Sequence, residues 1–346
     1  MNETPRKEEK KDIVGIHILR VVLCFAVIMN HFWEDTSNHL YEIPLCNLMR
    51  CAAPAFMFVS FLFTEKLLFN PSFAAIRKRI IRLVWPFAVW GIVSWCVVFF
   101  AGLILKTKIA DGFHALFWQL ATGHGYHVNA PLWYLALSIW ITLLYCLLFH
   151  LLKKKAAIAI HVLAVFCIVS QYTGWNYALF NNLPFELKYP LGRIAEMIPY
   201  ATLGYDVAYA RSHFEFSRRQ VTFLLIVSLV VALVFLGTKH STLARGFEYS
   251  GLFLLAGATC FATVFYLLPL QWLPDSKKQI IVFFCSHTLG IYCMHYPVGN
   301  ILKSLLEKFH INLNSLLLCV FIYALCFCLS SFLSFFHYKA LKELVD

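Results

Sequence analysis

The feature that most constrains this chain is its series of long apolar runs. Of its 346 residues, 60% are hydrophobic and only 14% are charged. A helix needs roughly 20 apolar residues to cross a ~30 Å hydrocarbon layer. Windows of that length predict ten spanning helices, at 13–33, 43–64, 83–105, 131–152, 156–173, 190–210, 221–237, 250–269, 280–302 and 313–336. The sequence therefore predicts an all-α polytopic membrane protein.

The basic residues predict how these helices are oriented. Lys and Arg concentrate in alternate connections such as "KKK" and "RSHFEFSRR", whereas the acidic "EDTSNHLYE" belongs to the opposite set. Positive residues favour the cytoplasmic side, so both termini are predicted to be cytoplasmic. The net charge of +11 then reflects topology and does not predict a nucleic-acid partner.

The chain is predicted to form one integral-membrane domain over residues 1–346. Cytoplasmic tails at 1–12 and 337–346 flank a transmembrane bundle at 13–336. The first run is too long for a signal-peptide core, so it is expected to stay as a helix. We therefore expect a multi-pass protein of the cell (inner) membrane, with lipids around the helices.

The cysteines and histidines do not predict a metal site. Nearly all twelve cysteines lie inside apolar runs, without paired loop spacing, and are expected to pack as small core residues. His114, His124 and His127 share an outer connection with no acidic or cysteine ligand at a fixed spacing. That connection, after Asp111, is expected to form a short interfacial helix, a candidate lid.

Arg20 and His31 are unusual because both fall in the first predicted spanning helix. Charged groups there cost on the order of 2.5–3.5 kcal/mol and usually face a cavity or a partner. Eleven residues at about 100° each return close to a whole number of turns, so the two side chains share a face roughly 16 Å apart. The alternative is that Arg20 extends to the headgroups and His31 caps the helix end.

Five segments, in order, carry a likeness to a known family. They are the Arg-x10-His pair at 20 and 31, "APAFMFVSFLF", "KRIIRLVWPFAVW", "PLWYL" and "SHTLGIYCMHYPV". Together they make the chain resemble the acyltransferase 3 family of membrane O-acyltransferases over nearly its whole length. One departure is Phe61, which stands where the family usually has Gly.

The resemblance implies an enzyme that moves an acyl group, acetyl or succinyl, from cytoplasmic acyl-CoA to a hydroxyl. The acceptor would be a cell-surface glycan or a lipid-linked sugar. Acyl-CoA would be the donor substrate, and no permanently bound cofactor is expected. The chain would be a stand-alone version, similar to exopolysaccharide acyltransferases. The sequence leaves the acceptor and the formation of a homodimer open.

The expected chemistry needs a base and a site for the CoA phosphates. His31 is predicted to be the base or a transient acyl carrier, with Glu34 one turn further on to fix its tautomer. Glu34 can equally be an exposed helix-end acid. Arg20, Arg79 and Arg82 are predicted to bind the phosphates; positive-inside anchoring explains Arg79 and Arg82 equally well. A cavity connecting Arg20 and His31 is expected to carry the pantetheine arm of CoA.

A second group of residues is expected near the outer level of His31, where it would bind the acceptor. The predicted members are Trp133, Tyr134, Arg193, Glu196 and His295. Simpler roles stay open for all of them: an interfacial aromatic belt, a packing ion pair, and a helix-to-helix hydrogen bond.

The alternative function is a polytopic transporter of a glycan, a lipid-linked sugar or a small solute. Intramembrane charges fit that function too. The sequence has no internal repeat and no broken, glycine-rich helices, which many secondary transporters use. The enzyme is therefore the favoured hypothesis.

Overall fold

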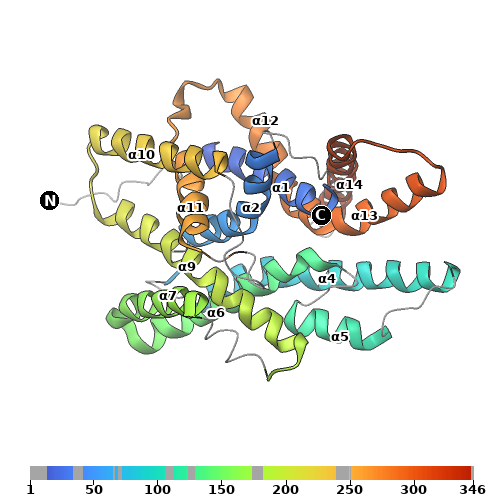
Figure 1. Ribbon diagram of the computed structural model, residues 1–346, viewed down its shortest axis with the longest axis horizontal. Coiled ribbons are helices and arrows are strands. Elements are labelled where there is room, and N and C mark those ends of the chain that lie inside the picture. Colours follow the sequence, from blue (N-terminus) through green and yellow to red (C-terminus); the bar gives the residue numbers. More distant parts are fainter. Residues whose placement is uncertain are drawn as a thin grey trace.

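A computed structural model shows a bundle made of helices (Figure 1). It describes residues 14–33, 42–64, 67–68, 72–105, 112–123, 129–173, 182–238, 249 and 251–343; at 42, 101–105, 112, 185–186 and 336–343 the description is of the backbone alone. The α-helices are α1 (Val14–Phe32), α2 (Glu42–Leu62), α4 (Phe73–Leu105), α5 (Gly112–Thr122), α6 (Trp133–Leu152), α7 (Ala156–Thr173), α9 (Phe185–His213), α10 (Arg218–Gly237), α11 (Leu252–Leu267), α12 (Asp275–Ser286), α13 (Thr288–Lys308) and α14 (Ser315–Glu343). Short 3-10 turns are η1 (Ala130–Leu132), η2 (Lys153–Lys155) and η3 (Leu270–Trp272).

The prediction of an all-α polytopic membrane protein is confirmed. Within the described residues, six helical stretches are long and apolar enough to cross a membrane. One of them, Ala130–Thr173, contains both α6 and α7. The number of ten crossings and the cytoplasmic termini stay predictions. The helix expected after Asp111 is present as α5; its place at the membrane interface stays a prediction.

Two predicted helices differ from those observed. The third was expected to begin at residue 83, but α4 begins at Phe73 and includes the basic residues before it. The ninth, expected as one helix over 280–302, is divided between α12 and α13 at His287. Ser286 and Thr288 donate side-chain hydrogen bonds to the carbonyls of Phe283 and Cys285. Such local bonds compete with the backbone ladder, which is consistent with a break at this point.

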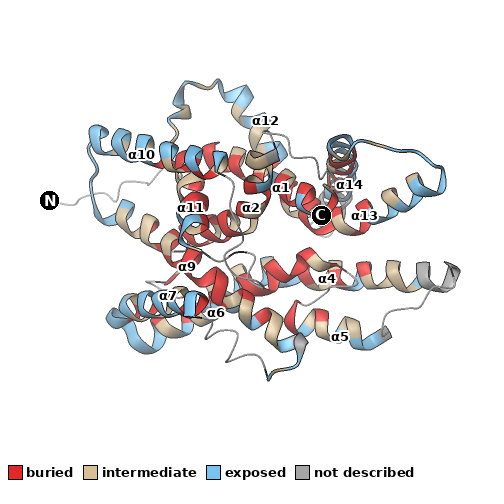
Figure 2. Cartoon of the chain, in the orientation of Figure 1, coloured by how far each residue is buried: buried red, intermediate tan, exposed pale blue. Residues whose placement is uncertain are grey.

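Helices α1 and α2 form the centre of the bundle. Each has 56% of its apolar window buried, against 17% for α4 and α10. Helix α1 packs against α2, α11, α12, α13 and α14, whereas α2 packs against α9, α10 and α11. Figure 2 shows buried residues concentrated on α1, α2 and α11, and exposed ones along α7 and α10. The exposed side chains of α10 include Phe223, Ile226 and Val230, as expected for a surface that faces lipid.

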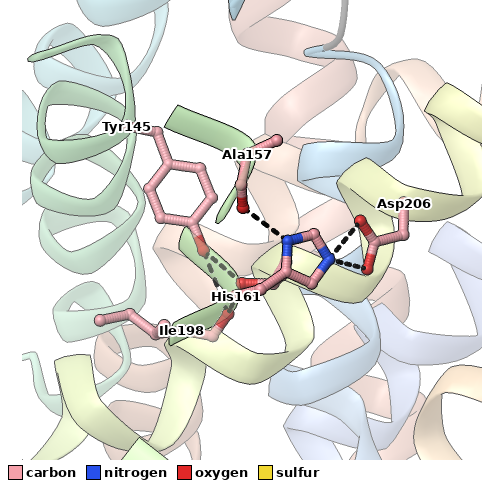
Figure 3. Close-up of polar contacts among 6 residues, drawn as sticks. Tyr145, Ala157, His161, Ile198 and Asp206 are labelled. Atoms are coloured by element: carbon pink, nitrogen blue, oxygen red, sulfur yellow. Dashed lines mark hydrogen bonds and ion pairs between the residues drawn. The ribbon is translucent and has the colours of Figure 1, made fainter. Parts of the chain in front are cut away.

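Polar contacts join α6, α7 and α9 on the side of the bundle shown in Figure 3. The Tyr145 hydroxyl lies 2.7 Å from that of Thr202. His161 lies with Nδ1 2.6 Å from the Ala157 carbonyl and with Nε2 3.0 and 3.1 Å from the two oxygens of Asp206. A carbonyl only accepts, so Nδ1 of His161 donates to Ala157. The second bond has one proton, which Nε2 and the Asp206 carboxyl share between them. The pair therefore ties α7 to α9.

The carbonyls at the end of α10 are capped from another helix. Asn47 of α2, which is 3% exposed, directs its amide nitrogen at the carbonyls of Phe235, Leu236 and Thr238, at 2.8, 3.2 and 2.9 Å. The last carbonyls of a helix have no partner within it. In an apolar surrounding each unpaired one costs free energy, so Asn47 fixes where α10 ends against α2.

We predict that Asn47→Ala lowers the free energy of unfolding by about 1–3 kcal/mol, because it leaves buried carbonyls unpaired. Thermal unfolding in detergent, followed by tryptophan fluorescence, measures the change. Asn300→Ala, at an exposed position of α13, is the matched control and is expected to unfold like the wild type. Equal midpoints for the two variants would show that the cap contributes nothing.

Candidate functional site

Arg20 and His31 lie on one uninterrupted helix, α1, as the sequence predicted. Their spacing places Cys24 and Val27 between them on the same stripe, at steps of four, three and four residues. Arg20 and His31 are both half-buried. The regular helix sets their separation at about 16 Å along the axis.

His31 lines a narrow, partly open cavity with a volume of about 20 Å³, so it must widen to admit a substrate. The cavity lies between α1, α2, η1 and α6, and Tyr249 and Tyr292 complete it. Trp133 and Tyr134 are in the same lining, so the structure brings these two predicted residues together with His31. The full lining is Val27, Asn30, His31, Met49, Ala52, Ala53, Phe56, Pro131, Trp133, Tyr134, Tyr249 and Tyr292.

Two tyrosines of the lining, Tyr249 and Tyr292, were not predicted from the sequence. Tyr292 donates a hydrogen bond to the Pro131 carbonyl and so joins α13 to η1. It lies three residues before His295, and that helical spacing was a signal that pointed to it. Tyr249 stands between α10 and α11, where no periodicity marks it. Its carbonyl accepts a hydrogen bond from Tyr200 at 3.0 Å.

His295 lies against His31 and outside the lining of the cavity. The ring centroids are 5.4 Å apart, and Tyr296 is equally close to His31, at 5.4 Å, edge to face. His295 is fully buried, with Nδ1 2.7 Å from the Tyr292 carbonyl. Its predicted contact with the acceptor stays a prediction; α13 places its ring against that of His31.

Arg193 and Glu196 form a buried ion pair behind one wall of the cavity. The nitrogen-to-oxygen distance is 2.8 Å, and the side chains are 8% and 1% exposed. The guanidinium carbon lies 5.6 and 4.8 Å from the ring centroids of Trp133 and Tyr249. Those two rings line the cavity and Arg193 does not. The pair therefore supports the aromatic wall; its predicted contact with the acceptor stays a prediction.

Arg79 joins three helices through its guanidinium. It donates to the hydroxyl and the carbonyl of Ser60 on α2, at 2.9 and 3.2 Å, and to the hydroxyl of Thr142 on α6, at 3.2 Å. Arg82, one turn further along α4, is exposed. The structure thus separates two residues that were predicted to act alike: Arg79 is bonded within the protein, whereas Arg82 is accessible.

The cavity does not extend along α1 to Arg20. Its lining on α1 runs from His31 to Val27, one turn away. In the next turn Leu23 and Cys24 are buried, at 0% and 1% exposure. A connected passage between Arg20 and His31 was predicted, and this packed turn separates the two.

Two other predictions concern the surroundings of the site. Glu34, predicted to orient His31, lies outside the described residues. No cluster of His, Cys, Asp and Glu that could hold a metal ion occurs among the residues the structure describes. Of the outer histidines, His114 accepts a hydrogen bond from the Trp118 ring at 2.9 Å.

The fold and the site define a polytopic helical membrane protein in which a histidine and several aromatic rings line one cavity between central helices. The chain belongs to the acyltransferase 3 family: the family model described as an acyltransferase domain matches residues 13–335. The protein is therefore a membrane acyltransferase, as the resemblance predicted, and its substrates include an acyl donor and an acceptor. Comparison with curated proteins and with solved structures gave no match.

We predict that removing one partner of the Arg193–Glu196 pair is more damaging than removing both. Glu196→Gln leaves a buried charge uncompensated, so we expect a loss of about 3–5 kcal/mol in the free energy of unfolding. The double variant Arg193→Met/Glu196→Leu is expected to lose less. Unfolding of Arg193→Met, Glu196→Leu and the double variant measures the coupling, and additive losses would contradict it.

Proposed function

We propose that this acyltransferase moves an acyl group, acetyl in the first instance, from cytoplasmic acyl-CoA to a hydroxyl of a cell-surface glycan or a lipid-linked sugar. His31 is the general base or a transient acyl carrier. The single observation that carries the proposal is the place of His31: it lines a cavity between the central helices of an acyltransferase. Family membership favours this enzyme over the transporter considered as the alternative.

Two routes use the same imidazole. As a base, His31 takes the proton of the acceptor hydroxyl while the alkoxide attacks the thioester carbonyl; the carbon–sulfur bond breaks, and the CoA thiolate takes the proton back. As a carrier, a His31 nitrogen attacks first, releases CoA and forms an acyl-imidazole, which the hydroxyl then attacks. Both routes need one ring nitrogen with a free lone pair on the cavity side.

The lining of the cavity supports a sugar acceptor. Trp133, Tyr134, Tyr249 and Tyr292 give it aromatic walls, and His31 and Asn30 add polar groups. Ligand sites generally combine apolar and aromatic walls with a few polar groups that fix orientation. An acceptor ring lying against these walls would present one hydroxyl to His31.

The basic start of α4 supports a CoA donor on the side predicted to be cytoplasmic. Arg77, Lys78 and Arg82 are exposed there and can meet the negative phosphates. Leu23 and Cys24 are packed between Arg20 and the cavity. When the donor binds, this turn of α1 must move apart from its neighbours so that the pantetheine arm reaches His31.

We predict that the purified protein transfers acetyl from acetyl-CoA and that His31→Ala lowers this rate by at least ~100-fold, because the base contributes a factor of that order. Release of CoA, followed with a thiol reagent, measures the rate. His150→Ala, at an exposed position near the end of α6, is the matched control and is expected to keep wild-type turnover.

Turnover in folded His31→Ala at the wild-type rate would remove His31 from the mechanism. Single-turnover labelling with radioactive acetyl-CoA separates the two routes. Label that stays on denatured wild-type protein and is absent from His31→Ala indicates the carrier route. Transfer without any labelled protein indicates direct attack with His31 as base.

We further predict that Arg79 and Arg82 variants fail in different ways. Arg82→Ala is expected to raise KM for acetyl-CoA about tenfold, the loss of one charge-assisted contact of about 1.5 kcal/mol, with unchanged stability. Arg79→Ala is expected to lower the thermal midpoint, because the bonds to Ser60 and Thr142 are lost. Steady-state kinetics and thermal unfolding on each variant test this. An unchanged KM in Arg82→Ala would contradict a phosphate role.

A further inference from the structure

His295 is buried with one ring nitrogen bonded and the other unpaired. Nδ1 lies 2.7 Å from the Tyr292 carbonyl. A carbonyl can only accept, so Nδ1 carries the hydrogen and Nε2 is left as a lone-pair acceptor. Nε2 has no hydrogen-bond partner among the described residues. A buried acceptor left unpaired costs about 1–3 kcal/mol, so this atom calls for an explanation.

The imidazole of His31 lies against the ring of His295. The two ring centroids are 5.4 Å apart, with the ring planes inclined by 40°. Because a ring nitrogen lies about 1 Å from its own centroid, this separation matches two imidazoles whose nitrogens meet at roughly 3 Å, a hydrogen-bonding distance. Nε2 of His295 is unpaired within the part of the chain that the structure describes, so this bond requires the His31 ring to rotate toward it.

The packing of α1 against α13 holds the two rings at this separation. Gly299 lies one turn beyond His295, and a Cβ atom there would overlap the ring of Phe32, the residue next to His31. Only glycine lets the two helices approach this closely at the level of the histidines. Phe32 itself is buried, at 4% exposure.

We propose that His295 is a positioning residue for the reaction: its Nε2 accepts a hydrogen bond from one nitrogen of His31 and so directs the other nitrogen, with its lone pair, into the cavity. The bond to Tyr292 prevents the His295 ring from presenting a donor instead. When His31 takes the hydroxyl proton, both of its nitrogens carry hydrogen, and the bond to His295 stabilises that cation. His295 thus has the role that a carboxylate has in a hydrolase triad.

This inference rests on the proposed function, and the two can fail separately. Two variants of the same residue give the test. In His295→Asn, the side-chain amide nitrogen takes the place of Nδ1 and keeps the bond to the Tyr292 carbonyl. Asn has no atom at the position of Nε2. Gln at 295 offers a side-chain oxygen near the position of Nε2. A purely structural role predicts that Gln is no better than Asn.

We expect His295→Asn to lower kcat at least about tenfold with KM for acetyl-CoA within about twofold, since the lost interaction orients the base. His295→Gln is expected to recover much of that loss. His287→Asn, which replaces another buried histidine of the same segment that bonds to Ser330, is the matched control and should keep wild-type kcat. Wild-type kcat in His295→Asn, or equal loss in both 295 variants, overturns the inference.

A second measurement needs neither turnover nor a 295 variant. Wild-type protein with 15N-labelled histidine, reconstituted in lipid, is expected to show His31 in one fixed tautomer with a nitrogen-to-nitrogen coupling to His295; His31→Ala assigns the signals. An absent coupling overturns the inference. If the wild type shows the coupling but transfers no acetyl group, the proposed function fails and the hydrogen bond stands.

Discussion

The whole structure depends on one constraint: a polar group inside a bilayer must find its partner within the protein. Asn47 meets it by capping the end of α10, and Arg79 by joining α2, α4 and α6. Arg193 meets it with Glu196 and with the faces of aromatic rings. Each of these side chains connects helices that are distant in sequence, so the polar residues determine which helices are neighbours.

The same constraint builds the site. The ion pair of Arg193 and Glu196 supports Trp133 and Tyr249 from behind, and those rings form the wall that faces His31. The hydrogen bond from Tyr292 to Pro131 joins α13 to the turn before α6. The candidate cavity is therefore held by an ion pair outside it and by a hydrogen bond between two of its lining residues, while His31 stays half-buried.

Much of this could be predicted from sequence, because hydrocarbon thickness and helix periodicity act locally. They gave the apolar helices, the shared face of Arg20 and His31, and helix α5. The break at His287 was not predictable from hydropathy, since it involves side-chain bonds of Ser286 and Thr288 within an otherwise apolar run. The place of His295 depends on how closely α13 approaches α1, which no local pattern encodes.

The same need for hydrogen-bond partners also explains the places of Arg79 and Arg193. Arg79 was predicted to bind phosphates and Arg193 to bind the acceptor, and both side chains are bonded within the protein. A guanidinium has five donors. Within the bundle, Arg79 directs donors at Ser60 and Thr142, and Arg193 directs one at Glu196. Nε2 of His295 and Oδ1 of Asn129 are buried and have no hydrogen-bond partner among the described residues, and the same holds for polar atoms of Gln119 and Tyr323. Asn129 donates to the Cys293 carbonyl and His295 to that of Tyr292, so the two flank the same turn of α13. Two of the unpaired buried acceptors therefore lie at one turn of α13, the turn that carries His295, where a cost in stability is expected if function and stability compete.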